Sequence, residues 1–224
     1  MKLYFHPTST TSRIVQLFAL EQGIDLDYQV VDLFTGEHLK PEFARINPSS
    51  LVPVLEDGDF RLTESSAIIK YLADKAGSPA YPKDLKARAR VNEMMDWFNS
   101  NIYKDFAYGL IYPQAFPHHQ RPSDEVQSGT LDWGKQKTQS WLKILDESLI
   151  GPNKAYLCGD AITLADYMGA EMIALGGLIR CSYSAYPNIE RWLRNMKALK
   201  NWSKVHEAIE GFGASLKDKA FIAI

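Results

Sequence analysis

Cysteine is scarce in this chain, which holds only Cys158 and Cys181 among its 224 residues. Two cysteines are too few for the disulfide framework of small secreted proteins, so we expect free thiols in a reducing compartment. No stretch approaches the roughly 18 to 20 consecutive apolar residues that a membrane helix needs. The opening run, Met1 to Pro7, is short and broken by proline, which predicts neither a signal peptide nor a transit peptide. We therefore expect a cytoplasmic protein without a membrane partner.

An excess of one charge is also missing. The formal net charge is −2, so no overall basic field favours nucleic acid or an anionic membrane as a partner. The five histidines are scattered except for His118 and His119, which lie in a proline-rich stretch without a third ligand nearby. Because a structural zinc ion requires four spaced ligands, we expect no metal site.

The first 76 residues alternate short strands with helices. Residues 2–6, 27–31, 53–56 and 60–63 have the length and apolar content of strands, and Asp57-Gly58 is a hairpin turn signal between the last two. Apolar spacing predicts a helix that ends at Gly23, a short helix over 41–46, and a third over 64–76. The order β-α-β-α-β-β-α predicts a small mixed sheet covered by helices.

Residues 77–84, rich in glycine and proline, are the predicted linker to a second domain, 85–224, in which nearly every pattern is helical. The spacing predicts one or two helices over 85–112, stopped by Pro113 and Pro117, and another over 123–149. Further helices are expected from Thr163, after Pro187 and over 202–209. The tail from Gly211 has no predicted structure.

Several segments carry a resemblance to a known family. They are residues 2–16, Val31 to His38, Asn47 to Gly58 with its Val52-Pro53 pair, Leu62 to Ile68 with Glu64-Ser65, and Gly159 to Asp166. Together they resemble theta-class glutathione transferases and their bacterial dehalogenase relatives. The resemblance implies an α/β thioredoxin-like domain over 1–76, followed by an all-helical domain over 85–224 that contributes the site for an electrophile.

The loop from Thr8 to Ser12 offers two ways of stabilising a thiolate. A thiol has an ordinary pKa of about 8.5, and lowering it by two units needs ~2.7 kcal/mol of preferential stabilisation of the anion. A hydroxyl hydrogen bond and the N-terminus of the first helix both act in that direction. The resemblance places the catalytic serine at Ser9. The residues alone also allow Ser9 or Thr10 to be an ordinary helix N-cap, and Tyr4 on the first strand is a rival for the catalytic role.

The resemblance also implies a glutathione-binding surface made by Thr10, His38, Val52, Pro53, Glu64 and Ser65. A cis Val52-Pro53 bond would leave the Val52 backbone groups free to pair with a peptide, whereas a trans bond at the start of a strand is the ordinary alternative. Glu64 is expected to bind the ammonium of the γ-glutamyl group, and Ser65 with the helix start its carboxylate. His38 and Lys40 are candidates for the glycyl carboxylate.

The electrophile is expected to bind between the Thr8 loop and the long helix after Arg90. Aromatic side chains there are the candidate pocket residues: Tyr103, Phe106, Tyr108, Tyr112 and Phe116. Aromatic residues at helical spacing also serve as plain core, which is the alternative for each of them. Thr163 and Asp166 have the spacing of a capping box, a structural feature.

The resemblance therefore implies an enzyme that transfers glutathione, its co-substrate, to an apolar electrophile in detoxification, with organic peroxide reduction as a side activity. It also implies a homodimer. The main alternative is a non-catalytic relative that carries ligands or binds proteins, because a fold alone does not decide function. An isomerase of the same superfamily is a weaker alternative, because its usual serine- and cysteine-rich loop is absent here.

Overall fold

A four-stranded mixed sheet forms the first part of the molecule in the computed structural model, which describes residues 1–224. Its strands are β1 (Lys2–Phe5), β2 (Asp27–Val30), β3 (Val54–Asp57) and β4 (Phe60–Thr63), in the order β2-β1-β3-β4. β1 pairs parallel with β2 and antiparallel with β3, which continues antiparallel into β4. The mixed sheet expected from the sequence is therefore confirmed.

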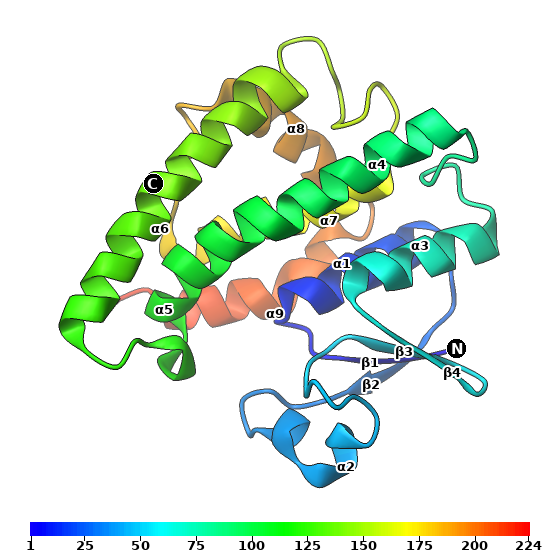
Figure 1. The fold of residues 1–224 in the computed structure, drawn as a ribbon, viewed down its shortest axis with the longest axis horizontal. Helices are drawn as coiled ribbons and strands as arrows, with labels where there is room; N and C mark the ends of the chain where they lie inside the picture. The colour runs from blue at the N-terminus through cyan, green and yellow to red at the C-terminus, as the bar shows by residue number, and fades with distance from the viewer.

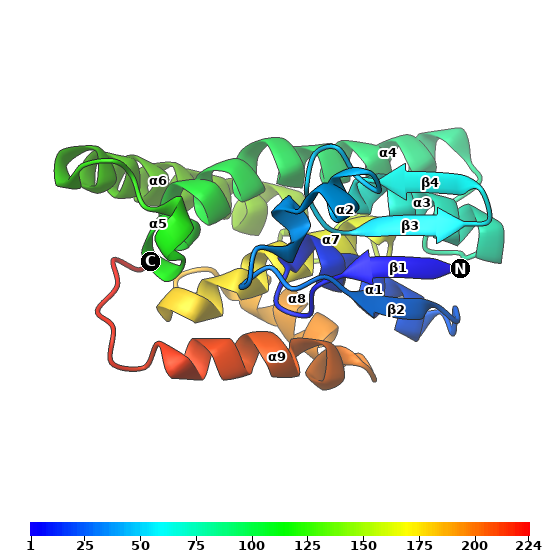
Figure 2. The same ribbon diagram turned by 90° about the horizontal axis from the view of Figure 1, so that it is seen from below.

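Helices cover both faces of this sheet. α1 (Thr10–Glu21) and α3 (Ser65–Ala76) lie on the face turned toward the rest of the molecule, and α2 (Pro41–Ala44) lies on the other (Figures 1 and 2). A one-turn helix, η1 (Glu37–Leu39), leads into α2. The loop between β1 and α1 comprises only residues 6–9, so it holds the carboxyl end of β1 close to the N-terminus of α1.

The remainder is all helical, as expected. Residues 77–84 contain no helix or strand, and the helices that follow are α4 (Leu85–Trp97), η2 (Phe98–Ile111), α5 (Tyr112–Ala115), η3 (Pro117–His119), α6 (Asp124–Ile144), η4 (Leu145–Ile150), α7 (Leu164–Ala174), η5 (Leu175–Ile179), α8 (Pro187–Lys197) and α9 (Trp202–Ser215). The stretches η2 and η4 are π-helical continuations of α4 and α6. None of these helices combines the length and the apolar character that crossing a bilayer requires.

Two predicted helix ends are wrong. Pro113 does not stop the long helix, because it lies in the first turn of α5, where its missing N–H is tolerated, and the chain turns out of the helix at Phe116. α9 continues past Gly211 to Ser215, where Gly213 faces Leu178, so packing offsets the poor helix propensity of glycine.

The tail after α9 has a defined course. It runs back to α5 (Figure 2), where Gln114 bonds both the N–H and the carbonyl of Ile222 through its side-chain amide. Arg180 donates to the carbonyls of Leu216, Lys217 and Lys219. The C-terminal segment is thus held against the helical part by polar contacts to its backbone.

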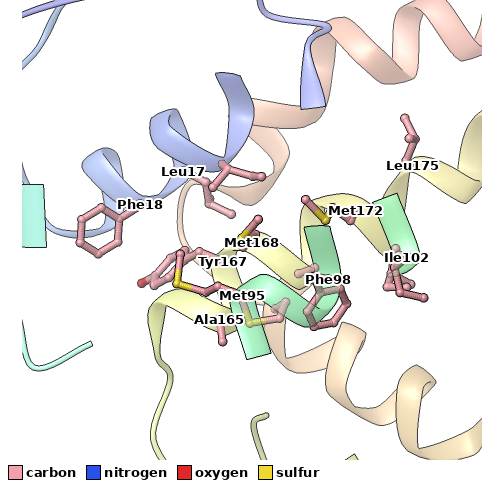
Figure 3. Close-up of a cluster of buried hydrophobic side chains, with 14 of the residues drawn as sticks. Leu17, Phe18, Met95, Phe98, Ile102, Ala165, Tyr167, Met168, Met172 and Leu175 are labelled. Carbon is pink, nitrogen blue, oxygen red and sulfur yellow. The ribbon is translucent and has the colours of Figure 1, made fainter. Parts of the chain in front are cut away.

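The main hydrophobic core extends without a break from the sheet into the helices. Leu17 and Phe18 on α1 pack toward Met95 and Phe98 on the long helix and Met168 on α7 (Figure 3). The rings of Phe18 and Tyr167 meet edge to face at 5.3 Å. This packing holds α1 against the helical part of the molecule.

Candidate active site

A cavity of about 240 Å³ lies where the sheet part meets the helical part. Five segments that are distant in sequence line it: residues 8–11, residues 33–38 after β2, residues 50–52, residues 103–119 from η2 to η3, and Leu175 at the start of η5 (Leu175–Ile179). Its lining residues are Thr8, Ser9, Thr10, Thr11, Leu33, Phe34, His38, Ser50, Leu51, Val52, Tyr103, Tyr108, Tyr112, Phe116, His118, His119 and Leu175. One wall carries hydroxyls and backbone groups, and the opposite wall is aromatic.

Ser9 is the N-cap of α1 and lines the cavity. Its backbone is extended (φ −71°, ψ 122°), and its Oγ accepts a hydrogen bond from the Ser12 N–H at 3.3 Å. The amides of Thr10 and Thr11 donate to no protein atom, as expected for the first turn of a helix. Capping and anion binding are therefore compatible here, because the cap leaves two N–H groups and the helix dipole available to a thiolate.

Hydrogen counting shows that the Ser9 hydroxyl can be redirected. Thr11 Oγ1 donates its only hydrogen to the Val52 carbonyl at 3.0 Å. In the 3.1 Å contact between the Ser9 and Thr11 hydroxyls, Ser9 must then be the donor. A thiolate is a charged acceptor and competes well against a neutral hydroxyl, so rotation of Ser9 toward sulfur exchanges a weak bond for a stronger one.

Residues 50–65 bring the predicted peptide-binding groups together. The Val52-Pro53 bond is cis, and the Val52 N–H donates to no protein atom. Because Val54 pairs with Thr63, Glu64 follows β4 directly opposite Pro53. Pro53, Glu64 and Ser65 are thus placed beside Val52, although they do not belong to the cavity lining.

Two residues in this region have backbone conformations that are unusual outside glycine. Ser50 has φ 55° and Glu64 has φ 65°. Such conformations cost of order 1–3 kcal/mol each and cluster at ligand sites, where the surrounding structure holds them in place. They support a binding role for the edge of the sheet between the two residues.

Of the remaining candidates, His38 lies at the cavity, whereas Lys40 and Tyr4 lie elsewhere. His38 lines the cavity, and burial together with the nearby His118 lowers its pKa from 6.5. Lys40 instead lies over a shallow depression at the β2 edge. Tyr4 borders that same depression and its ring packs on Phe43 at 6.4 Å, so the rival to Ser9 does not line the cavity.

The aromatic wall contains four of the five predicted residues. The Tyr112 hydroxyl bonds Thr10 Oγ1 at 3.3 Å and the Tyr103 hydroxyl at 3.1 Å. Tyr108 and Phe116 pack edge to face on the Tyr112 ring. Phe106, the fifth predicted residue, does not line the cavity. It is fully buried on another side of η2, so close to Gly176 that a side chain at that glycine would collide with it.

Several cavity residues were not predicted from the sequence. They are Leu33, Phe34, Ser50, Leu51, His118, His119 and Leu175, whereas Thr8 and Thr11 belong to the loop that the sequence indicated as a whole. His118 and His119 directly follow Phe116, which is a local signal that they belong to the same wall. Phe34 and Leu175 carry no such signal, since only the tertiary fold brings the loop after β2 and the start of η5 to the cavity.

A buried ion pair supports the Ser9 loop from behind. Arg13 donates through Nε to Glu171 Oε2 at 2.9 Å and through a terminal nitrogen to the Thr8 carbonyl at 2.7 Å. Both side chains are almost fully buried, with 1% and 0% exposed. The loop that carries Ser9 is therefore tied to α7.

Comparison with known proteins assigns the chain to a class. Residues 3–80 match the family described as "Glutathione S-transferase, N-terminal domain", and residues 115–200 match "Glutathione S-transferase, C-terminal domain". The chain belongs to the glutathione S-transferase family. Its fold and its enzyme type, a transferase that uses glutathione, are those expected from the sequence resemblance.

The relatives include theta-class enzymes, as the sequence resemblance implied. The chain is 33% identical to human glutathione S-transferase theta-1 over 213 residues, which cover 94% of this chain and 88% of that protein. It is 35% identical to a delta-class glutathione transferase of Nilaparvata lugens, with a TM-score of 0.83 and coverage of 96% and 98%. It is 29% identical to the crystal structure of human theta-2 in complex with glutathione and an unknown ligand, with a TM-score of 0.81 and coverage of 100% and 93%.

Proposed function

We propose that this enzyme binds glutathione along the edge of the sheet and transfers its thiolate, held by Ser9, to a small apolar electrophile. The main supporting observation is that Ser9, together with Thr10 and Thr11, whose backbone N–H groups donate to no protein atom, lines a cavity whose opposite wall is aromatic. Val52, Pro53, Glu64 and Ser65 would hold the peptide, with Thr10 and His38 near the thiol and glycyl ends. A human theta-2 structure is a glutathione complex, which supports the same ligand here.

Transfer of glutathione to an electrophile requires an ionised thiol and a binding site for the electrophile beside it. The hydroxyl and the helix N-terminus would favour the anion, while the aromatic wall would hold the electrophile within reach and exclude water. Tyr103, Tyr108, Tyr112 and Phe116 are the proposed electrophile-binding residues. Retention of the whole glutathione-binding set also argues against the non-catalytic alternative.

An ultraviolet difference titration of bound glutathione against pH tests the role of Ser9. We expect a thiol pKa well below 8.5 in the native protein and a return toward that value in Ser9→Ala. A shift of two units would reduce the conjugation rate at pH 6.5 by about 50-fold, because the thiolate fraction falls by that factor. Ser140→Ala on the exposed face of α6 is the matched control and should leave both quantities unchanged.

The same depressed pKa in the native protein and in Ser9→Ala would refute the serine role. Absence of any thiolate signal in the native protein would refute the proposal as a whole.

We also propose two accompanying properties. The same thiolate would reduce organic hydroperoxides: sulfur attacks the terminal oxygen, the O–O bond breaks, and the alkoxide leaves and takes up a proton from water to become the alcohol. A second glutathione then converts the sulfenic acid to glutathione disulfide and water. Glutathione disulfide formation with cumene hydroperoxide as the substrate measures this peroxidase activity.

The second proposed property is a homodimer, which would cover exposed apolar side chains such as Leu51 and Trp133. The molecular mass in solution tests it.

A further inference from the structure

His6 contacts the loop that carries Ser9 at three points. It directly follows β1, and only 6% of the residue is exposed. Its carbonyl accepts a hydrogen bond from the Ser9 N–H at 3.0 Å, and its N–H donates to Ser12 Oγ at 3.3 Å. The third contact is made by the ring, whose Nδ1 lies 3.3 Å from the Thr8 backbone nitrogen and 2.8 Å from Thr8 Oγ1. His6 therefore bonds the residue before Ser9, Ser9 itself and the first turn of α1.

The donors around the imidazole determine where its hydrogen lies. A backbone N–H can only donate, so the Thr8 N–H requires an Nδ1 that carries no hydrogen. The Thr8 hydroxyl must then donate to the same nitrogen. The imidazole is therefore neutral, with its one hydrogen on Nε2. A side-chain acceptor bonded to the N–H two residues later is the contact that asparagine and aspartate make in an Asx turn.

Thr8 uses all of its polar groups in these contacts. His6 accepts from its N–H and its hydroxyl, and Arg13 donates to its carbonyl at 2.7 Å. Arginine has no acceptor, so the acceptor for the two Thr8 donors has to come from another residue, and the His6 ring supplies it. Thr8 lines the cavity and directly precedes Ser9. Its orientation therefore sets the direction in which the chain enters Ser9.

The surroundings of His6 keep this acceptor available at neutral pH. Burial lowers the pKa of His6 from 6.5; the nearby Asp32 carboxylate opposes the shift, and His38 adds to it. The ring of Phe34 also meets the imidazole edge to face at 5.2 Å. The neutral ring that the Thr8 contacts require is thus the form that its environment favours.

We propose that His6 is a positioning residue for thiolate binding: its neutral Nδ1 accepts from Thr8 and so holds Ser9 where the hydroxyl and the first turn of α1 reach the glutathione sulfur. This role rests on the proposed function of Ser9. His6 itself does not line the cavity and so acts through Thr8 and Ser9. What the loop needs is an acceptor at the place of Nδ1, and an amide oxygen at that place would serve as well.

Two amide side chains that differ by one methylene test this role. The Oδ1 of asparagine can take the place of Nδ1, whereas the Oε1 of glutamine lies one bond farther out. We would titrate the thiol of bound glutathione by ultraviolet difference in the native protein, in His6→Asn and in His6→Gln. His6→Asn should keep the native thiol pKa.

In His6→Gln the thiol pKa should rise by about one unit, which lowers the thiolate fraction at pH 6.5 about fivefold. This rise is smaller than the one expected for Ser9→Ala, because the Ser9 hydroxyl remains. An unchanged thiol pKa in His6→Gln would overturn the proposal. So would a raised thiol pKa in His6→Asn, even if His6→Gln did not fold, because the ring would then matter for something other than its acceptor.

The position of the ring hydrogen can be measured without glutathione. In protein labelled with nitrogen-15 histidine, the chemical shifts of the two ring nitrogens show which of them carries hydrogen, and the loss of signals in His6→Asn assigns those of His6. We expect the hydrogen on Nε2 at pH 7. Hydrogen on Nδ1 would overturn the proposal whatever the thiol pKa. Absence of any thiolate signal in the native protein would instead refute the proposed function of Ser9, and this role with it.

Discussion

At the scale of single residues, hydroxyl groups dominate the polar wall of the cavity. A hydroxyl rotates and both donates and accepts, so Ser9 can cap α1 while it turns its hydrogen toward a ligand. The sequence resemblance pointed to Ser9, but not to Thr11, whose bond to the Val52 carbonyl fixes the direction of the Ser9 hydrogen. That relationship depends on two segments 41 residues apart and has no local signature.

Glu171 accepts the hydrogen bond from Arg13, the residue that holds the Ser9 loop through the Thr8 carbonyl. Besides Arg13 it faces His206 Nε2 at 3.2 Å, while His206 Nδ1 donates to the Trp202 carbonyl at 2.9 Å. Burial alone would raise the pKa of Glu171, but Arg13 and His206 hold it below the ordinary 4.5. Glu171 thus joins α1, α7 and α9.

Glu171→Gln is expected to lower the free energy of unfolding at pH 7 by about 3 kcal/mol, because it leaves the buried Arg13 charge without its partner. It should also change the pH dependence. A carboxyl whose pKa is lowered by folding adds stability above about pH 4.5, and that stability is lost as the pH falls through the folded-state value.

Urea unfolding between pH 7 and pH 3.5 measures both effects. The native protein should lose more stability than Glu171→Gln over the acid range, and Glu93→Gln, in an exposed pair with Arg90, is the control. Parallel stability curves for native protein and Glu171→Gln would show that Glu171 does not carry the acid dependence.

At the scale of elements, the capping box at the start of α7 was predicted from Thr163 and Asp166, and the structure contains it. The sequence did not predict the further hydrogen bonds that the Asp166 side chain accepts. Its carboxylate also accepts bonds from the Leu157 N–H at 2.8 Å and from the Trp192 indole at 2.9 Å. Asp166 therefore joins the preceding loop and α8 to the helix that it caps.

Asp166→Ala should reduce the free energy of unfolding by about 3 kcal/mol or more, because several buried donors lose their acceptor. An ordinary cap is worth about 1 kcal/mol, which is the loss expected for Ser123→Ala at the exposed start of α6. Thermal or chemical unfolding of the two variants makes the comparison. Equal losses would mean that Asp166 acts as a local cap alone.

Element type was easier to predict than element ends, for a physical reason. Alternation and helical spacing in the chain reflect burial, so the sheet and most helices followed from the sequence. The ends at Pro113 and Gly211 did not follow from it. Pro113 is tolerated because it lies in the first turn of α5, and α9 continues past Gly211 because it packs on Leu178 at Gly213. In the same way, Phe106 has the spacing of a pocket residue, and only the position of Gly176 shows which side of η2 it occupies.

At the scale of the whole molecule, Phe212 connects three regions at the edge of the cavity. Its ring stacks on Phe116 at 5.2 Å and meets Phe34 at 5.6 Å, so α9 joins the aromatic wall to the loop after β2. No sequence pattern indicated this contact, because its partners lie in separate parts of the chain.

Phe212→Ala should raise KM for the electrophile several-fold, because Phe34 and Phe116 both lose the ring that orders them, and should cost about 2 kcal/mol in unfolding free energy. Phe60→Ala is the control: that ring packs on Tyr71 beside the β3–β4 turn and does not line the cavity. Steady-state kinetics and urea unfolding report the two effects. A loss of stability with an unchanged KM would show that Phe212 does not order the cavity wall.

The cavity lining contains no carboxylate, lysine or arginine, and burial lowers the pKa of both His38 and His119. Such a lining projects little long-range potential toward approaching molecules. A charged electrophile would therefore gain little electrostatic steering, and added salt should change its association rate little. Selection among electrophiles would then begin only after contact, through shape and hydrogen bonding at the aromatic wall.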